Sequence, residues 1–423
     1  MSKITKVKGF PDLFPPQSNL YVFMENTARK IFSYYGCEEI RTPILEKTEL
    51  FARSIGNETD IVQKEMYTFL DKKNRSLTLR PEATAGVVRA FIENVQAKSD
   101  EVFKFFTIGP MFRYERPQKG RLRQFHQINV EYFGPQSPQA DGELILMLWH
   151  YLHALQLNNL SLQINSLGCP QCRPIFEQKL IAFLQTVDEA ALCPDCQRRK
   201  TTNPLRVLDC KEQSCKQILI KAPTIIDNLC STCRSHFQAV LDILDNTKIP
   251  YQLNHKLVRG LDYYQRTTFE VIATSNNIGA QSAIAGGGRY DGLVKNLGGP
   301  DVPGLGFACG MERIALLLEV QNNLQKDFFI AVLSEKCLLP AMSLANKLRH
   351  QGLSGEVSFE VKSLKSQLRY ANKHNIKICL FFGEDELHSG KIPVKDLETG
   401  TQHEVFFEDI ITTLKRFLKT EIG

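Results

Sequence analysis

Arginines stand at three widely separated places in the sequence, each beside residues that could contact a nucleotide. Arg113 lies just before a polar loop at 116–123, Arg259 lies in the segment Leu-Val-Arg-Gly-Leu-Asp-Tyr-Tyr, and Arg313 follows a glycine-rich run. A guanidinium presents a planar fork of N–H donors that matches the oxygens of phosphates and carboxylates. A fold that brings the three arginines together would create a site for a polyanionic ligand.

Two β-rich runs flank the polar loop, at residues 103–115 and 123–133. They predict a long antiparallel hairpin with a basic tip. Because side chains alternate between faces along a strand, Phe125, Gln127 and Glu131 share one face. An aromatic ring, an amide and a carboxylate on one face suit a flat ligand with polar groups, and a solvated sheet face is an equally weighted alternative.

Two short segments add polar groups that could bind a small molecule. Glu82 and Thr84 lie in Leu-Arg-Pro-Glu-Ala-Thr-Ala-Gly, where they either cap the following helix or contact a ligand. Tyr263 and Tyr264 follow Arg259; paired tyrosines are usually core residues, but the arginine beside them needs a partner, which an anionic ligand would supply. The glycines at 286–288 and 304–310 would let backbone approach such a ligand closely, although turns use glycine too.

Eight of the twelve cysteines fall between residues 169 and 233. Three pairs have the CxxC spacing and one pair has four intervening residues, and such spacing suits tetrahedral zinc. The cysteines could make two four-thiolate sites or one site with spare thiols, or they could simply be tolerated in a helical insertion. The candidate zinc ligands are Cys169, Cys172, Cys193, Cys196, Cys210, Cys215, Cys230 and Cys233.

The length and composition predict a multidomain protein of the cytoplasm. A chain of 423 residues exceeds the size of a single core, so two or more domains are expected. The net charge of +6 is a mild basic bias that is compatible with a polyanionic partner. No apolar run reaches the roughly 18 residues of a membrane span, and the first residues lack a secretory signal, so we expect no membrane association and a reducing compartment without disulfides.

The pattern of elements predicts three domains. A helix at 17–35 and a strand at 37–41 open a first domain at 1–325, which a helical cysteine-rich domain at 169–245 interrupts. Alternating strand and helix patterns at 327–423 predict a small domain with a largely parallel sheet. Its basic residues at helical spacing predict one outward face, which is either solvated or a contact for a phosphate backbone: Lys362, Lys365, Arg369, Lys373 and Lys377.

Taken together, these motifs resemble class II aminoacyl-tRNA synthetases. The stretch at 112–127, Phe-Arg-Tyr-Glu-Arg-Pro followed by Arg-Gln-Phe-His-Gln, resembles motif 2, and residues 304–313 resemble motif 3. The first helix, the strand and Pro43 resemble motif 1, the dimer-interface element. The segments at 79–86 and 257–264 are similar to signatures of histidyl-tRNA synthetases, apart from Ala83, where glycine is common.

The resemblance implies an α+β fold: an antiparallel-sheet catalytic domain of class II with a helical cysteine-rich insertion, and a C-terminal α/β anticodon-binding domain. It implies ATP-dependent activation of L-histidine with release of pyrophosphate, then transfer to tRNA(His), leaving AMP. It also implies Mg²⁺ at the leaving phosphates and a homodimer. Because hydrogen bonds to imidazole can reject analogues by about 10⁴–10⁵, we expect no editing domain.

The resemblance also assigns roles to individual residues. Arg113 and Arg259 are expected to be the catalytic groups. The residues expected at ATP are Arg113, Glu115, Arg121, Phe125 and Arg313. Those expected at histidine are Glu82, Thr84, Arg113, Gln127, Glu131, Arg259, Tyr263 and Tyr264. Besides the five basic residues of the C-terminal domain, the expected tRNA contacts are Arg116, Lys119 and Arg123.

Two other classes of protein share parts of this pattern. One is a catalytically silent paralogue that resembles the regulatory subunit of ATP phosphoribosyltransferase, which would bind histidine and report it. The other is a zinc-dependent nucleic-acid-binding protein with a decayed synthetase core. The presence of Arg113, Arg259 and Arg313, together with the C-terminal domain, argues against both.

Overall fold

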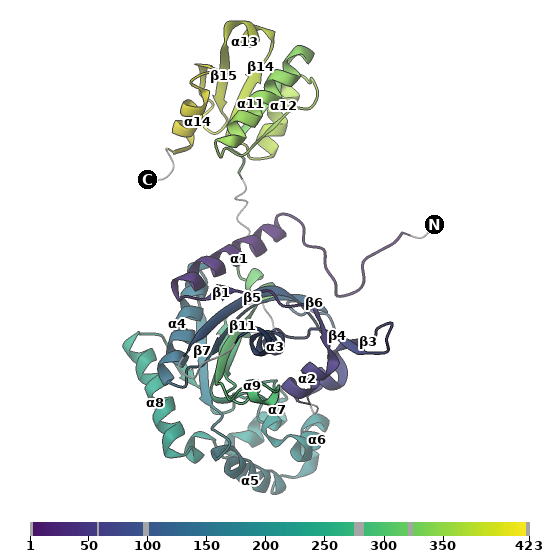
Figure 1. The fold of residues 1–423 in the computed structure, drawn as a ribbon, viewed down its shortest axis with the longest axis vertical. Helices are drawn as coiled ribbons and strands as arrows, with labels where there is room; N and C mark the ends of the chain where they lie inside the picture. Colours follow the sequence, from purple (N-terminus) through teal and green to yellow (C-terminus); the bar gives the residue numbers. More distant parts are fainter. Residues whose placement is uncertain (1–2, 57–58, 96–100, 275–282, 320–324, 420–423) are drawn as a thin grey trace. The chain divides into compact units, whose positions relative to one another are not determined.

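The hairpin predicted from residues 103–133 forms two neighbouring strands of a large β-sheet (Figure 1). The computed structural model describes residues 3–56, 59–95, 101–274, 283–319 and 325–419. Within them the chain forms two compact units, Met1–Val320 and Gln321–Gly423. Residues 320–324 of the predicted first domain and residues 420–423 of the predicted C-terminal domain lie outside the described residues.

The large sheet of the first unit has the strand order β1-β5-β6-β11-β10-β9-β7-β8. Its neighbours run antiparallel except at the two edges, where β1 is parallel to β5 and β7 is parallel to β8. The predicted antiparallel sheet is therefore mixed at its margins. The strands are β1 (Glu38–Glu39), β5 (Phe103–Phe112), β6 (Gln124–Phe133), β7 (Leu160–Ser166), β8 (Tyr251–Leu253), β9 (Gln265–Ala273), β10 (Ala283–Arg289) and β11 (Gly304–Gly310).

Strand pairing brings the distant motifs together. In the hairpin, Phe112 pairs with Gln124, so β5 ends three residues before the predicted run. Strand β11 lies beside β6 with Gly306 opposite Glu131, and β10 lies between β11 and β9. The glycine-rich segments therefore lie next to the polar face of the hairpin, although about 150 residues separate them in sequence.

Four helices cover one face of the sheet and bury its apolar side chains. In the longest, Met24, Ala28 and Phe32 are spaced at four residues and are fully buried, as an amphipathic helix requires. They share a core with Ile128 and Val130 of the hairpin. The predicted strand at 37–41 is shorter than expected. The helices are α1 (Gln17–Tyr34), α4 (Pro138–Ala154), α8 (Ser231–Asn246) and α10 (Met311–Ala315).

Smaller elements assemble around the first unit's second core. A three-stranded sheet has the order β2-β4-β3, and the helices beside it include the one that begins at Thr84. The elements are β2 (Leu45–Lys47), α2 (Thr48–Ile55), the π-helix η1 (Ile61–Glu65), β3 (Tyr67–Leu70), β4 (Ser76–Leu79), α3 (Thr84–Asn94) and α9 (Leu293–Asn296).

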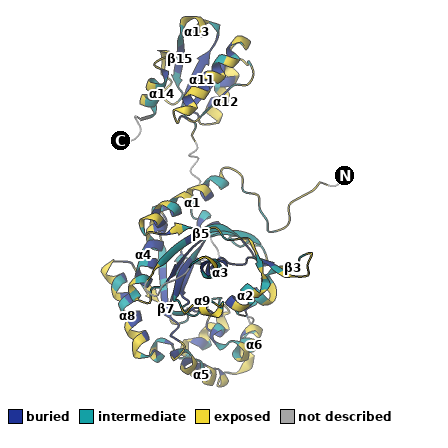
Figure 2. Ribbon diagram, viewed as in Figure 1, coloured by how far each residue is buried: buried dark blue, intermediate teal, exposed yellow. Residues whose placement is uncertain are grey.

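The cysteine-rich segment is helical, and its core is continuous with that second core. Phe176 and Leu180 belong to the same buried cluster as Val88, Tyr263 and Tyr290. The buried residues lie inward and the outer helical surfaces are exposed (Figure 2). The elements before α8 are α5 (Cys172–Gln185), η2 (Glu189–Ala191), α6 (Pro194–Thr202), η3 (Pro204–Val207), α7 (Gln213–Ile218), η4 (Leu219–Lys221) and η5 (Ile226–Asn228).

The second unit has its own five-stranded sheet in the order β13-β12-β14-β15-β16. The first three strands are parallel, but β15 and β16 run antiparallel, so the prediction of a largely parallel sheet was only half right. The elements are β12 (Phe328–Val332), η6 (Glu335–Cys337), α11 (Leu338–His350), β13 (Gly355–Val357), α12 (Leu364–Lys373), β14 (Ile378–Phe382), α13 (Glu384–Ser389), β15 (Lys391–Asp396), β16 (Gln402–Phe406) and α14 (Ile410–Lys419).

Candidate active site

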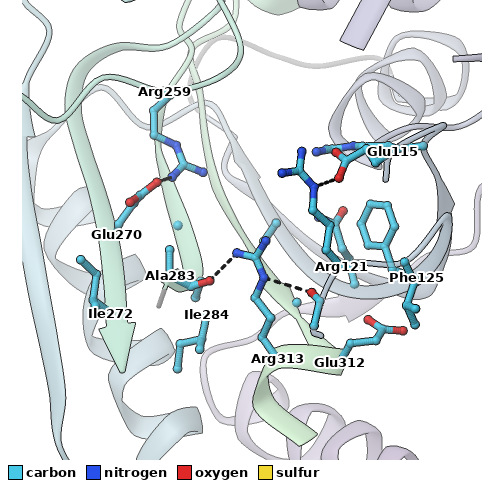
Figure 3. Close-up of a pocket in the computed structure, with 18 of the residues that line it drawn as sticks. Glu115, Arg121, Phe125, Arg259, Glu270, Ile272, Ala283, Ile284, Glu312 and Arg313 are labelled. Atoms are coloured by element: carbon cyan, nitrogen blue, oxygen red, sulfur yellow. Dashed lines mark hydrogen bonds and ion pairs between the residues drawn. The ribbon is translucent and has the colours of Figure 1, made fainter. Parts of the chain in front are cut away.

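A cleft of about 480 Å³ lies against strands β6, β10 and β11, and all three predicted arginines line it. Figure 3 shows Arg259 at the left, Arg121, Glu115 and Phe125 at the right, and Arg313 between them. The cleft thus collects residues that are about 200 positions apart in the sequence. The remaining lining residues that matter here are Arg113, Gln127, Asp209, Lys211, Glu270, Gly286 and Glu312.

Arg113 is held at the loop end of the hairpin. Its backbone N–H donates to Arg123 O at 2.8 Å, and its Nε donates to Pro81 O at 2.9 Å. The guanidinium carbon lies 5.3 Å from the centre of the Phe125 ring. Nearby, Arg121 forms an ion pair with Glu115. The phenyl ring and the guanidinium groups therefore offer a stacking surface beside N–H donors.

Arg259 enters the cleft from the loop before β9. Its Nη1 donates to Glu270 Oε1 at 2.5 Å, and its Nε is buried without a partner among the described residues. Gly286 makes this position possible, because a Cβ there would overlap the guanidinium. A buried N–H donor that lacks a partner is costly, so Arg259 is suited to an added acceptor such as a carboxylate or phosphate oxygen.

Arg313 reaches the cleft from helix α10. Its Nη1 donates to Ala283 O at 2.6 Å and its Nε donates to Gly120 O at 3.3 Å (Figure 3). These two carbonyls aim the guanidinium across the cleft. Glu312, the preceding residue, accepts from the backbone N–H of His126 at 2.9 Å and also contacts its ring Nδ1 at 3.0 Å. Residues 312 and 313 thus join β6 to β10.

Burial and neighbouring charges shift the pKa values of the arginines in the cleft. Burial lowers the pKa of Arg113 and of Arg313, and neighbouring arginines lower both further. Arg259 is different, because Glu270 holds its pKa above the usual value in spite of burial. Like charges gathered in one concave site store repulsion that an anionic ligand relieves.

A second group of polar residues lies in the interior beside Arg113. Glu131 is 1% exposed and accepts hydrogen bonds from Thr84 Oγ1 at 2.7 Å and from the Tyr290 hydroxyl. Burial raises its pKa to about 8, and the charge of Glu82 adds to that rise. A buried carboxyl with two hydroxyl donors is suited to a cationic group such as an ammonium.

Glu82 has the first of the two roles that the sequence allowed, which is to cap the following helix. Its carboxylate accepts from the backbone N–H groups of Thr84 at 2.7 Å and Ala85 at 2.9 Å, and so caps helix α3. It is also buried, which raises its pKa, and its charge acts on Arg113 and Tyr263. The cap fixes the carboxylate beside the candidate ligand site.

Tyr263 and Tyr264 close this interior region. Both are buried, with ring centres 4.7 Å apart, and Tyr263 packs edge-on against Tyr290 at 5.6 Å. Gln127 Oε1 is buried and has no partner within the described residues. The predicted histidine-contact residues therefore gather in one place, next to the arginine-lined cleft.

Three residues at this site were missed from the sequence. Tyr290 follows the glycine run, for which only a close approach of the backbone was predicted. Glu270 lies on strand β9 and was not predicted as a site residue. Glu312 stands between the motif 3 glycines and Arg313. For Glu270, the alternation of side chains along its strand is the one sequence feature that could have pointed to the site. For Tyr290, no sequence feature distinguishes it from a tyrosine of the core.

The expected tRNA contacts are distributed over both units. Arg116 and Lys119 are exposed at the hairpin tip, whereas Arg123 lies 4.0 Å from the Tyr114 ring. In the second unit Lys365, Arg369 and Lys373 are exposed on α12. The predicted basic helix is shorter than expected, because Lys362 precedes α12, where it pairs with Glu360, and Lys377 follows it.

The eight clustered cysteines form two groups. Cys169, Cys172, Cys230 and Cys233 make the first sulfur cluster, and Cys193, Cys196, Cys210 and Cys215 make the second. Within each cluster the sulfur atoms lie within 4.8 Å of one another. The pairing of the four motifs, which the sequence left open, is thus first with fourth and second with third.

The comparisons with known proteins cover both units. A family model described as histidyl-tRNA synthetase matches residues 9–314. The chain belongs to the histidyl-tRNA synthetase family. A second model, described as an anticodon binding domain, matches residues 327–417. The predicted family is therefore confirmed, as is its class II fold with a C-terminal anticodon-binding domain.

Individual relatives match over nearly their whole length. The histidine–tRNA ligase of Nitratidesulfovibrio vulgaris (strain Hildenborough) is 58% identical over 405 residues, which cover 96% of this chain and 97% of that protein. The histidine–tRNA ligase of Geobacter sulfurreducens is 51% identical over 95% of this chain and 97% of that one. The apo structure of S. aureus histidyl-tRNA synthetase has a TM-score of 0.80 at 34% identity, with 98% and 100% coverage.

A further solved structure relates to the alternative of a regulatory paralogue. The protein from Bacillus halodurans C described as an ATP phosphoribosyltransferase regulatory subunit/histidyl-tRNA synthetase has a TM-score of 0.65 at 19% identity, with 90% and 99% coverage. At that identity the likeness shows a shared fold alone. Among the described residues, no helix is long and apolar enough to cross a membrane.

Proposed function

We propose that the arginine-lined cleft and the group of buried polar residues beside it, which we call the interior pocket, are where this chain activates histidine and passes it to tRNA. The activity itself, ligation of histidine to tRNA, follows from family membership and from 58% identity over 97% of a histidine–tRNA ligase. It agrees with the prediction from the motifs. The assignment of steps to residues is our proposal.

The first step joins two anions. A histidine carboxylate oxygen attacks the α-phosphorus of ATP, a bond to that phosphorus forms, and pyrophosphate leaves. Arg113 and Arg259 would flank the carboxylate and the α-phosphate, offsetting their repulsion and the charge that develops in the transition state. Alignment of two bound substrates supplies the rest, so no nucleophilic side chain is needed.

The nucleotide would lie along the hairpin. Phe125 would offer a ring for the adenine, and Arg313 and Arg121, which line the same cleft, would contact the β- and γ-phosphates. The observation that supports this assignment is the convergence of four guanidinium groups on one cleft. Burial lowers the pKa of three of them, Arg113, Arg121 and Arg313, and a neighbouring arginine lowers each of these further. The bound triphosphate would relieve that repulsion.

Histidine would occupy the interior pocket. The Glu131 carboxyl, with its partner Thr84, would take the α-ammonium group, and Glu82, Gln127 and the tyrosines would contact the remaining polar atoms. The partnerless Gln127 Oε1 supports this placement, since a ligand donor would satisfy it. An amino acid without a matching ring N–H would leave such groups unpaired.

In the second step the 3′-terminal hydroxyl of tRNA attacks the carbonyl carbon of histidyl-adenylate, and AMP leaves. Arg116 and Lys119 at the hairpin tip, and Lys365, Arg369 and Lys373 on α12, are exposed cations available to the phosphate backbone. We assign tRNA(His) as the partner and the cytoplasm as the compartment.

Magnesium would enter with ATP. The carboxylates of Glu115 and Glu312 line the cleft and are the hard oxygen donors that Mg²⁺ prefers, so the residues fit the ion. When bound, Mg²⁺ would neutralise the leaving phosphates. The cysteine-rich segment would hold zinc in a structural role, since no cysteine is among the described residues that line the cleft.

The active form would be a homodimer. Apolar side chains on α1 and the turn after β1 are exposed, including Val22 (55%), Phe23 (44%) and Ile44 (42%). A second copy of the chain that covers this surface would remove apolar area from water, which favours association. The surface belongs to the part of the chain that resembles motif 1.

The test is ATP–pyrophosphate exchange, measured with and without histidine. Arg259→Gln is expected to lower histidine-dependent exchange by about 10²-fold or more, as for the loss of a charge-stabilising donor. Arg369→Gln on α12 is the matched control and should leave exchange unchanged. Exchange that needs no histidine, or histidine binding without exchange in the unaltered chain, would contradict the proposal; the latter is the result expected of a regulatory paralogue.

A further inference from the structure

The two sulfur clusters have the dimensions of tetrahedral metal sites. Cys169 and Cys172 have their sulfur atoms 3.5 Å apart, and the sulfurs of Cys193 and Cys210 are 3.7 Å apart. With Zn–S bonds of about 2.3 Å, the edge of a tetrahedron is about 3.8 Å. A disulfide requires about 2.05 Å, and all eight cysteines are free.

Local structure prepares the thiolates for a cation. The first cysteine of the pairs at 193/196 and 230/233 is the N-cap of a helix, α6 or α8, whose positive terminus favours a thiolate. Two backbone amides also donate to sulfur: Cys193 N–H to Cys215 at 3.3 Å and Cys230 N–H to Cys172 at 3.2 Å. Each of these bonds joins two different pairs, so each cluster links segments that are far apart in the sequence.

Each cluster is connected to one end of the segment 259–264, which carries Arg259, Tyr263 and Tyr264. From the first cluster, Arg173, the residue after Cys172, donates from Nη1 to Tyr264 O at 3.1 Å. From the second, Arg206 donates from Nη1 to Arg259 O at 2.9 Å. Both bonds go to backbone carbonyls, so they fix the path of the segment rather than the charge of its side chains.

Residues next to the second cluster form part of the cleft wall. Asp209 and Lys211, the neighbours of Cys210 on both sides, line the cleft. Asn203, which begins the turn before Cys210, donates from Nδ2 to Asp262 Oδ1 at 3.2 Å. This loop contains only a short 3₁₀ turn, Pro204–Val207, so regular secondary structure does little to hold it.

We propose that each sulfur cluster binds one zinc ion, and that the two ions act as positioning elements that hold the segment 259–264, and with it the histidine pocket, in place. The positioning role rests on the function proposed above, whereas the binding of zinc does not. Four thiolates at one centre need a divalent cation to offset their repulsion, and the ion then ties each pair of helix starts together.

The metal content of the full-length protein, purified without added zinc, tests the first half. Elemental analysis is expected to give two zinc atoms per chain. Replacement by Co²⁺ should give the intense thiolate-to-cobalt absorption and the d–d bands of tetrahedral sulfur coordination. A content of one zinc atom per chain or none would overturn the proposal. So would a thiol titration showing that these cysteines are already oxidised to disulfides in freshly purified protein.

The double variant Cys210→Ser/Cys215→Ser tests the positioning role. It should bind one zinc atom and show a KM for histidine raised about tenfold or more, the usual range for groups that orient others, with the KM for ATP changed less. Cys337→Ser, a buried cysteine of the second unit, is the control and should keep two zinc atoms and the parent KM values.

If the double variant does not fold, removal of zinc from the unaltered protein by a chelator, followed by re-addition, gives the same comparison. A variant with one zinc atom and an unchanged KM for histidine would overturn the positioning role. An unaltered protein with two zinc atoms that fails to exchange pyrophosphate would instead refute the proposed function, so the two failures are distinct.

Discussion

At the scale of single residues, Glu131 is an acidic group almost completely removed from water. It is buried between a threonine hydroxyl and the Tyr290 hydroxyl, and the charge of Glu82 acts on it. Burial penalises the carboxylate and raises its pKa to about 8. In the chain without ligand this carboxyl is therefore mostly protonated at neutral pH.

This protonation state predicts a release of protons when histidine binds. An ammonium group beside Glu131 would favour the carboxylate and lower its pKa, so at pH 7 the carboxyl should lose a proton on binding. Calorimetric titration with histidine in buffers of different ionisation enthalpy measures this number directly, and we expect a value approaching one. Glu131→Gln should abolish that release, and an unchanged value in the variant would contradict the placement of the α-ammonium.

The same shift has a consequence for stability, with a definite sign. In the unfolded chain this carboxyl ionises near its ordinary value of 4.5, whereas in the folded chain it holds its proton up to about pH 8. The folded state binds more protons in that window, so its stability should fall as pH rises from about 4.5 to 8. Denaturant unfolding of the unaltered chain and of Glu131→Gln should show a weaker pH dependence in the variant.

At the scale of elements, the face of the hairpin could be predicted but its neighbours could not. Strand alternation alone placed Phe125, Gln127 and Glu131 together, because that rule is local. The positions of Glu270 and Tyr290 depend on the pairing of β9, β10 and β11, which is set by contacts between residues far apart in sequence. No pattern within one strand contains that information.

The C-terminal helix shows a different limit. A run of cations at helical spacing between 362 and 377 predicted one long basic face, but α12 spans only Leu364–Lys373. Ser363 begins the helix as its N-cap, with its side chain accepting from the Ser366 amide. At the other end Asn375 has a positive φ of 49°, which α-helix excludes. The basic residues repeat at helical spacing, but the spacing of charges does not determine where a helix begins and ends.

Strand β11 offers a test of how closely the elements must approach. A Cβ on Gly306 would overlap the Glu131 carboxylate and the Val130 carbonyl, both in the neighbouring strand β6. Gly306→Ala should therefore displace Glu131, lower stability by about 1–3 kcal/mol and weaken histidine binding. Urea unfolding and calorimetric titration with histidine measure the two effects.

Gly310 in the same strand is the matched control. A Cβ there would meet its nearest atoms, Ile284 O and Arg313 Cδ, at 3.9 and 4.0 Å, which is ordinary contact. Gly310→Ala should keep stability within about 1 kcal/mol of the parent. Equal losses from the two substitutions would mean that alanine is disfavoured in β11 generally, and that the approach of β11 to Glu131 is not the cause.

At the scale of the whole molecule, the proposed functions of histidine activation and tRNA binding belong to two units with separate cores. The buried clusters around the large sheet contain residues of the first unit only, and those around β12 and β14 contain residues of the second only. The residues proposed for ATP and histidine all belong to the first unit, whereas α12, with its exposed cations, belongs to the second.

Removal of residues 321–423 should therefore separate the two steps of the reaction. Histidine-dependent ATP–pyrophosphate exchange needs the cleft alone and should stay within about threefold of the full chain. Charging of tRNA should fall at least tenfold more than exchange does, because the lost cations neutralise phosphates and each contact adds to affinity in a salt-dependent way. Both rates are measured on the same preparations, with circular dichroism to check that the remaining unit is folded.

A full-length chain with Lys365→Gln, Arg369→Gln and Lys373→Gln separates the charge of α12 from the presence of the unit. Its exchange rate should match the parent, and its affinity for tRNA should fall with a shallower dependence on salt, since fewer counterions are released on binding. If the truncated chain loses exchange and charging to the same extent while it remains folded, the second unit must support the cleft itself. In that case tRNA affinity would not be its main contribution.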